Sequence, residues 1–144
     1  MTLGGELDAG LAPGSIRAER DGVIAEVDVE YVDRQGSRIR SVRVTSPVGV
    51  EVGTHASRLP DATRVLPDRI VPVEVAPSLG GAVLRSDPRH VRDREFFEVR
   101  TSGRVVDVER VRATETGREA TGFTVTRDQL RRLVDDLGES FRDG

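Results

Sequence analysis

The chain has 144 residues, the length of one ordinary domain, and 36% of them are hydrophobic, with valine prominent among these. Its formal charge of −3 is spread evenly, because residues 1–72 hold 9 Arg and 11 acids while residues 73–144 hold 13 Arg and 14 acids; this balance argues against a basic nucleic-acid-binding module. The absence of cysteine excludes disulfides, thiol nucleophiles and thiolate metal sites, and the absence of lysine excludes a Schiff base and a P-loop lysine.

The amino-terminal segment carries no recognisable targeting signal. It lacks the basic start and apolar run of a secretory signal peptide, and no stretch approaches the ~20 apolar residues that a membrane helix needs. We therefore expect a cytoplasmic protein without membrane contacts. Four glycines and one proline within residues 1–14 predict a flexible tail, followed by a single β-rich domain over residues 15–144.

Strand patterns dominate the first part of this domain. Asp21 and Gly22 favour a two-residue hairpin turn, because both central positions of that turn need positive φ. Residues 23–31 then alternate between apolar and acidic side chains, which predicts a strand with one buried and one solvated face. After a polar turn, the next predicted strand carries Val42 and Val44 inward.

The middle of the chain is less regular. Residues 53–69 hold two prolines and show no sustained hydrophobic period, which predicts a long loop with no more than one helical turn. Alternation returns over residues 70–76. Asp87 followed by Pro88 has the pattern of a helix N-cap, so we expect one solvated helical turn there and a strand that starts at the phenylalanine pair 96–97.

The last part of the chain combines strands with the clearest helix. The apolar positions of residues 105–114 change from even to odd numbers near Glu109 and Arg110, which predicts a β-bulge. Residues 127–137 place leucines on one stripe at helical spacing, and Thr126 is suited to cap this helix. The sequence therefore ends in an amphipathic helix that covers an apolar surface.

Together these elements predict a mainly β fold, α+β by content. The architecture that fits is an antiparallel β-sandwich or partly open β-barrel of about 7–8 strands with one C-terminal amphipathic helix. Turn signals about every eight to twelve residues support this fold class.

The chain offers few groups for catalysis. His55 and His90 are its only histidines, and neither has a second ligand two or four residues after it, so solvated loop positions explain them better than a metal site. No serine lies in a G-x-S-x-G motif, and the run at 78–83 lacks the lysine and the strand-to-helix context of a phosphate-binding loop. We assign no catalytic residue, no metal ligand and no cofactor.

Arginine is the best lead for a binding site, because its fork of N–H donors suits phosphate and carboxylate groups. Residues 85–104 contain six arginines, but four acids lie among them. Nucleic-acid binding would also need exposed aromatic rings, whereas the aromatic residues sit mostly at inward positions. The residues that we assign to an anionic ligand are Arg40, Arg89, Arg92, Arg100, Arg110 and Glu98.

On these grounds the sequence favours a non-enzymatic binding or assembly module that acts through a protein partner or self-association. A sheet edge, residues 53–69 and the C-terminal helix are its expected contacts. The alternative is a small β-barrel that binds or transforms an anionic small ligand in an enclosed pocket through strand arginines. Nucleic-acid binding is the weakest of the three interpretations.

Overall fold

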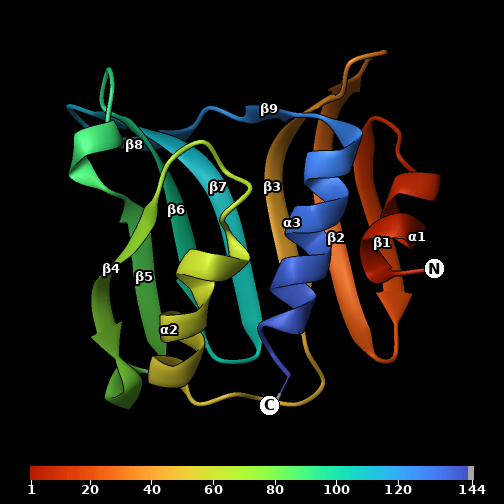
Figure 1. Ribbon diagram of the computed structural model, residues 1–144. Helices are drawn as coiled ribbons and strands as arrows, with labels where there is room; N and C mark the ends of the chain where they lie inside the picture. Colours follow the sequence, from red (N-terminus) through yellow and green to blue (C-terminus); the bar gives the residue numbers. More distant parts are fainter. Residues whose placement is uncertain (143–144) are drawn as a thin grey trace.

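The computed structural model describes residues 1–142 and, at His90, the backbone alone. These residues form nine strands, three α-helices and two short 3-10 helices (Figure 1). The helices are α1 (Leu3–Ala9), α2 (Val52–Ala62) and α3 (Arg127–Glu139), with η1 (Pro77–Leu79) and η2 (Pro88–His90) as the 3-10 helices. The strands are β1 (Gly14–Arg20), β2 (Val23–Val32), β3 (Ser37–Thr45), β4 (Ile70–Ala76), β5 (Gly81–Ser86), β6 (Glu95–Thr101), β7 (Val105–Thr114), β8 (Gly117–Ala120) and β9 (Phe123–Val125).

The nine strands of the described chain belong to one antiparallel sheet, whose main path runs β1-β2-β3-β7-β6-β5-β4. Two short strands complete it: β8 pairs with β7, and β9 pairs with β3. The path ends at β1 and β4, so the sheet does not close. The predicted mainly antiparallel β fold with a C-terminal amphipathic helix is confirmed, and α1 and α2 are two further α-helices that were not predicted.

The three helices of residues 1–142 lie on one side of this sheet (Figure 1). α2 packs on β4 and β5, whereas α3 packs on β3 and against α1. Alternate strand residues therefore point toward the helices, and Val27, Val42, Val99 and Val108 are almost fully buried there. We call the opposite side of the sheet the open face, because none of the described helices covers it.

Residues 1–14 are helical in part, which corrects the prediction of a flexible tail. α1 buries Leu3 and Leu7 in the core. A Cβ atom at Gly4 would collide with the backbone carbonyl of Arg131 on α3, so glycine at this position lets the two helices touch. A residue type that suggested flexibility here allows close packing instead.

Residues 53–69 contain most of α2, which corrects the prediction of a long loop. Ala56 and Leu59 on this helix are buried against the sheet. The helical period was hidden for two reasons: a polar residue, His55, occupies a buried position, and Pro60 lies inside the helix near its end.

Three other sequence predictions are confirmed. Asp21 and Gly22 form the turn between β1 and β2 with φ angles of 54° and 84°. η2 is a short helical turn capped by the side chain of Asp87. α3 starts with a capping box in which the side chains of Thr126 and Gln129 each accept a hydrogen bond from the backbone of the other residue.

The predicted bulge near Glu109 and Arg110 is wrong. β6 and β7 stay in regular antiparallel register along their whole pairing. The burial pattern changes because Val111, which lies on the open face, is only 2% exposed beside its cross-strand neighbour Phe96. The change from even to odd apolar positions therefore arises from buried residues on the open face, and not from a bulge.

His55 joins three parts of the chain inside the core. Its Nδ1 atom lies 2.6 Å from Thr101 Oγ1 on β6, and its Nε2 atom lies 2.8 Å from Ser140 Oγ just after α3. Its ring also stacks on Phe141 at a centroid distance of 4.2 Å. Ser140 donates its own hydrogen to the carbonyl oxygen of Leu137, so Nε2 of His55 must carry the hydrogen that bridges to Ser140. The neutral imidazole is therefore the form that fits this site.

Burial lowers the pKa of His55 from 6.5 to about 4, and the nearby positive charge of Arg58 acts in the same direction. Below pH 6.5 the unfolded chain takes up a proton at this residue that the folded chain refuses until about pH 4. The stability linked to His55 is thus complete above pH 6.5 and is lost as the pH falls toward 4. We expect it to amount to roughly 3 kcal/mol.

The variant His55→Gln tests this expectation. It should be less stable than the wild type at neutral pH, because glutamine cannot reproduce the ring contacts, but the histidine share of the pH dependence should disappear. Urea unfolding at neutral pH, and at pH values between 6.5 and 4, measures the two effects. An unchanged pH dependence in the variant would contradict the assignment.

Candidate functional site

Charged side chains cover much of the open face in cross-strand pairs. Arg40 on β3 lies 3.7 Å from Asp28 and 3.4 Å from Glu30, both on β2. Arg43 on β3 lies 2.7 Å from Asp107 on β7. Both arginine side chains are more than half exposed, and solvated pairs of this kind contribute at most about 1 kcal/mol each. These pairs are hydrated and do not form an enclosed site.

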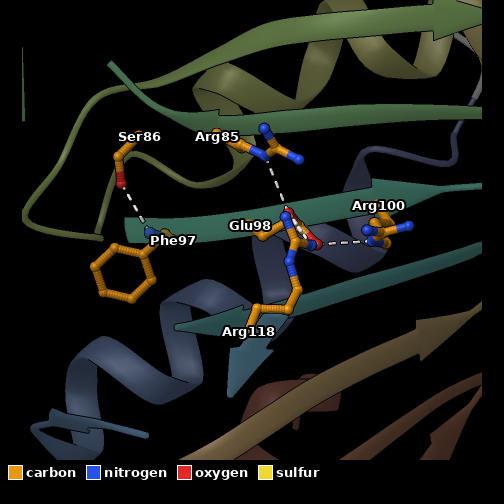
Figure 2. A network of polar contacts seen from close by, with 6 residues as sticks. All are labelled: Arg85, Ser86, Phe97, Glu98, Arg100 and Arg118. Carbon is orange, nitrogen blue, oxygen red and sulfur yellow. Dashed lines mark hydrogen bonds and ion pairs between the residues drawn. The ribbon is translucent and has the colours of Figure 1, made fainter. Parts of the chain in front are cut away.

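Glu98 on β6 differs from these pairs, because its side chain is only 1% exposed although it lies on the open face. Arg85 on β5 donates from Nε to one carboxylate oxygen at 3.0 Å, and Arg100 donates from Nε to the other at 2.8 Å. Arg118 on β8 reaches both oxygens from Nη1 at 2.6 Å (Figure 2). We call these four residues the Glu98 cluster.

The strand register brings the cluster together. Arg85 lies directly opposite Glu98 in the β5–β6 pair, and Arg100 lies two residues along β6, on the same face. Arg118 comes from β8, on the far side of β7, so its side chain crosses β7 to reach the carboxylate. The guanidinium groups of Arg85 and Arg118 also lie over the Phe96 ring, 5.4 Å and 5.9 Å from its centroid.

The neighbouring residues of both strands point to the helical side. Phe97 turns its ring away from the arginines, and its amide donates to Ser86 Oγ on β5 at 2.8 Å (Figure 2). Ser86 Oγ in turn donates to the carboxylate of Asp68 at 2.8 Å. The side chain of Ser86 thus replaces a backbone acceptor at the end of the β5–β6 ladder. This contact fixes the position of β6 next to Glu98.

The Glu98 cluster carries a surplus of positive charge. Burial raises the pKa of Glu98, but hydrogen bonds from Arg100 and Arg85, together with the charges of Arg100 and Arg118, outweigh it and bring the pKa below 4.5. Three guanidinium charges therefore face one ionised carboxylate. Glu109, directly opposite Glu98 in the β6–β7 pair, lowers this local surplus from two charges to one. Asp107, opposite Arg100, is balanced by its own partner Arg43.

Among the six residues that the sequence assigned to an anionic ligand, the structure brings Arg100 and Glu98 together. Arg110 instead lies on the helical side, where it pairs with Glu95 at 3.6 Å and covers the ring of Phe97. The remaining three lie apart from the cluster: Arg40 on β3, Arg89 in η2 beside Asp87, and Arg92 in the turn before β6.

Arg85 and Arg118 were not predicted as site residues from the sequence. Arg118 is 20 positions from Glu98 and reaches it across another strand, so no local pattern marks it. Arg85 stands out only once the register of β5 and β6 is known. The i,i+2 spacing of Glu98 and Arg100 on one strand was the available signal.

The contact between His55 and Ser140 has the distance of a catalytic pair but not its chemistry. Ser140 is only 6% exposed, and its hydroxyl hydrogen goes to Leu137 rather than to the imidazole. A histidine whose pKa is about 4 is also a weak base at neutral pH. We therefore assign this contact a structural role.

A second candidate surface is apolar and lies at the free edge of β4. The described part of the chain exposes six large hydrophobic side chains, and three of them, Val73, Val75 and Leu79, belong to β4 and η1. A hollow of about 340 Å³ beside them is lined in part by Leu79, Val83 and Val105. β4 pairs with β5 alone, so the backbone along its other edge has no strand partner among the described residues.

The described residues hold no group of three or more acids and histidines placed to bind a metal ion. The side chain of His90 lies outside the described part of the structure. No helix within residues 1–142 is both long and apolar enough to cross a membrane. In comparisons with known proteins, no family model, curated protein or solved structure significantly matches this chain.

We expect Glu98→Gln to lower the free energy of unfolding by ~1–3 kcal/mol at neutral pH, because it leaves three arginines around a neutral amide. Since the folded pKa of Glu98 lies below 4.5, the carboxylate stabilises the fold above that pH and loses this effect as the pH falls further. The difference between wild type and variant should therefore shrink in acid. Urea unfolding at neutral and acidic pH measures it.

Glu119→Gln is the matched control, because Glu119 is 60% exposed and lies 3.9 Å from Arg112. It should change the free energy of unfolding by less than about 0.5 kcal/mol. Equal losses in the two variants would show that the arginines around Glu98 have no special effect on stability.

Proposed function

We propose that the protein is a non-enzymatic assembly module whose copies associate through the free edge of β4. One observation carries this proposal: half of the exposed large hydrophobic side chains of the described chain gather at this edge, on residues 73–79. Apolar side chains beside unpaired backbone favour the addition of a further strand.

The composition of the edge supports a second copy of the chain as the partner. Residues 70–79 contain a single charged side chain, Glu74, in a protein in which 33% of residues are charged. An equally apolar strand is therefore the matching surface. A two-fold axis lets β4 of one copy pair antiparallel with β4 of the other, so that each copy contributes the same patch.

Two features keep this edge short. Pro72 lacks the N–H group that a strand pair needs, and the register of β4 and β5 shifts between Pro72 and Glu74. Pairing is then confined to residues 73–76, with Leu79 beside them. A short, irregular edge favours a defined contact over open-ended aggregation.

The other interpretations from the sequence have less support. Base stacking would need several exposed rings, but Tyr31, at 48%, is the one largely exposed ring of the described residues. Phe97, Phe123 and Phe141 are at most 5% exposed, and arginines lie over Phe96. Among the described residues, no nucleophile and base combine with a cavity that would hold a substrate. A cytoplasmic location, expected from the sequence, is kept as part of this proposal.

Val75→Glu tests the proposal, because it places a negative charge on the edge without touching the core. Val75 is 44% exposed, so the monomer should fold normally. We expect the wild type to show a concentration-dependent dimer in sedimentation velocity, and the variant to weaken that dimer at least about tenfold, since two like charges would meet across the two-fold axis.

Val48→Glu is the control: Val48 is 65% exposed and lies in the loop between β3 and α2, outside β4 and η1. It adds the same charge and should leave the dimer intact. A wild type that stays monomeric up to about 1 mM would refute the proposal, because an assembly contact that weak would contribute little. Equal weakening by both variants would refute the β4 edge as the contact.

A further inference from the structure

We propose that the Glu98 cluster is a binding site for a small oxyanion that carries at least two negative charges. The proposal does not depend on association through β4. It rests on the arrangement of Arg85, Arg100 and Arg118 around a carboxylate that they cover but do not fully neutralise.

The contacts with Glu98 leave donors available on each arginine. Arg85 and Arg100 use only their Nε groups for the carboxylate, and Arg118 uses Nη1. A guanidinium has five N–H groups, and the Nη groups of Arg85 and Arg100 make no hydrogen bond to any other described residue. The side chains of Arg85, Arg100 and Arg118 are 36%, 53% and 38% exposed, so these donors reach water.

The cluster is also held in place before any ligand arrives. The bonds to Glu98 fix one side of each guanidinium plane, and the ring of Phe96 supports Arg85 and Arg118 from below. Less side-chain freedom is lost when such arginines bind than when mobile surface arginines do. This arrangement distinguishes them from Arg40, which belongs to a solvated pair on the same face.

The number of converging guanidinium groups, rather than their net charge, selects the class of ligand. Because three guanidinium groups converge on one carboxylate, they lie close together and repel one another. A compact anion with several oxygens contacts two or three of them at once and relieves that repulsion. Glu109 leaves a surplus of one charge and disfavours larger acidic surfaces. A phosphate-type dianion fits these conditions better than a single carboxylate.

Inorganic pyrophosphate is the probe, measured by isothermal titration calorimetry at about 20 mM ionic strength, where charges are weakly screened. We expect saturable binding of one pyrophosphate per chain with a Kd below about 1 mM, and no saturation with acetate. Arg100→Gln and Arg118→Gln should each weaken the binding of pyrophosphate at least about tenfold.

Arg40→Gln is the matched control, because it removes one positive charge from the same face outside the cluster. It should weaken binding less than about threefold. Thermal unfolding of each variant shows whether it is folded; if removing Arg118 loosens β8, the Arg100 variant decides the result. Absence of saturable binding by the wild type, equal saturation with acetate, or an equal loss in Arg40→Gln would overturn the proposal. None of these results bears on the β4 edge.

Discussion

The helical layer covers one face of the sheet only, and this constraint determines which side chains each strand carries on its two faces. On the covered face, valines leave water and each buried methylene group contributes ~0.8 kcal/mol. On the open face the same strands carry charges that must find partners across the sheet. Glu98 is the acid that the described chain buries there, and its arginines replace the cover that the helices supply on the other side.

β6 connects the two faces. Glu98 and Arg100 point to the open face, whereas Val99 and Thr101 point to the core. Thr101 contacts His55 on α2, and His55 in turn contacts Ser140 beyond the end of α3. Polar contacts therefore link β6, α2 and the end of α3. A polar contact inside an apolar core tolerates little displacement, because each unpaired group would cost free energy. These polar contacts therefore fix the positions of α2 and α3 relative to β6, in addition to the apolar packing.

Periodic features of the sequence predicted much of this fold, and the failures have physical causes. Alternation revealed the strands, and the cap at Thr126 together with the leucine stripe revealed α3. α1 was missed because Gly4 serves packing against α3, and α2 was missed because a buried histidine and an internal proline hide its period. The roles of the glycine in α1 and of the histidine in α2 depend on tertiary contacts that the local sequence does not reveal.

The candidate sites were predictable to a smaller extent for the same reason. The sequence marks Glu98 and Arg100 as neighbours on one strand face, but Arg85 and Arg118 join them only through the register of β5 with β6 and of β7 with β8. The apolar edge was expected in general terms. Its location on β4 follows from the strand order, which places β4 at one end of the sheet.

The two proposed surfaces are governed by different physics and adjoin each other, because Arg100 of the Glu98 cluster also lines the hollow beside Leu79. β5 separates β4 from β6, so a strand added to β4 would lie ~14 Å from the strand of Glu98 at the usual strand spacing, beyond a Debye length at physiological salt. Antiparallel pairing of β4 with its copy places the two-fold axis perpendicular to the sheet, so both open faces turn the same way. The dimer would present two arginine clusters on one continuous surface, and a ligand with two anionic groups would gain from their combined effect.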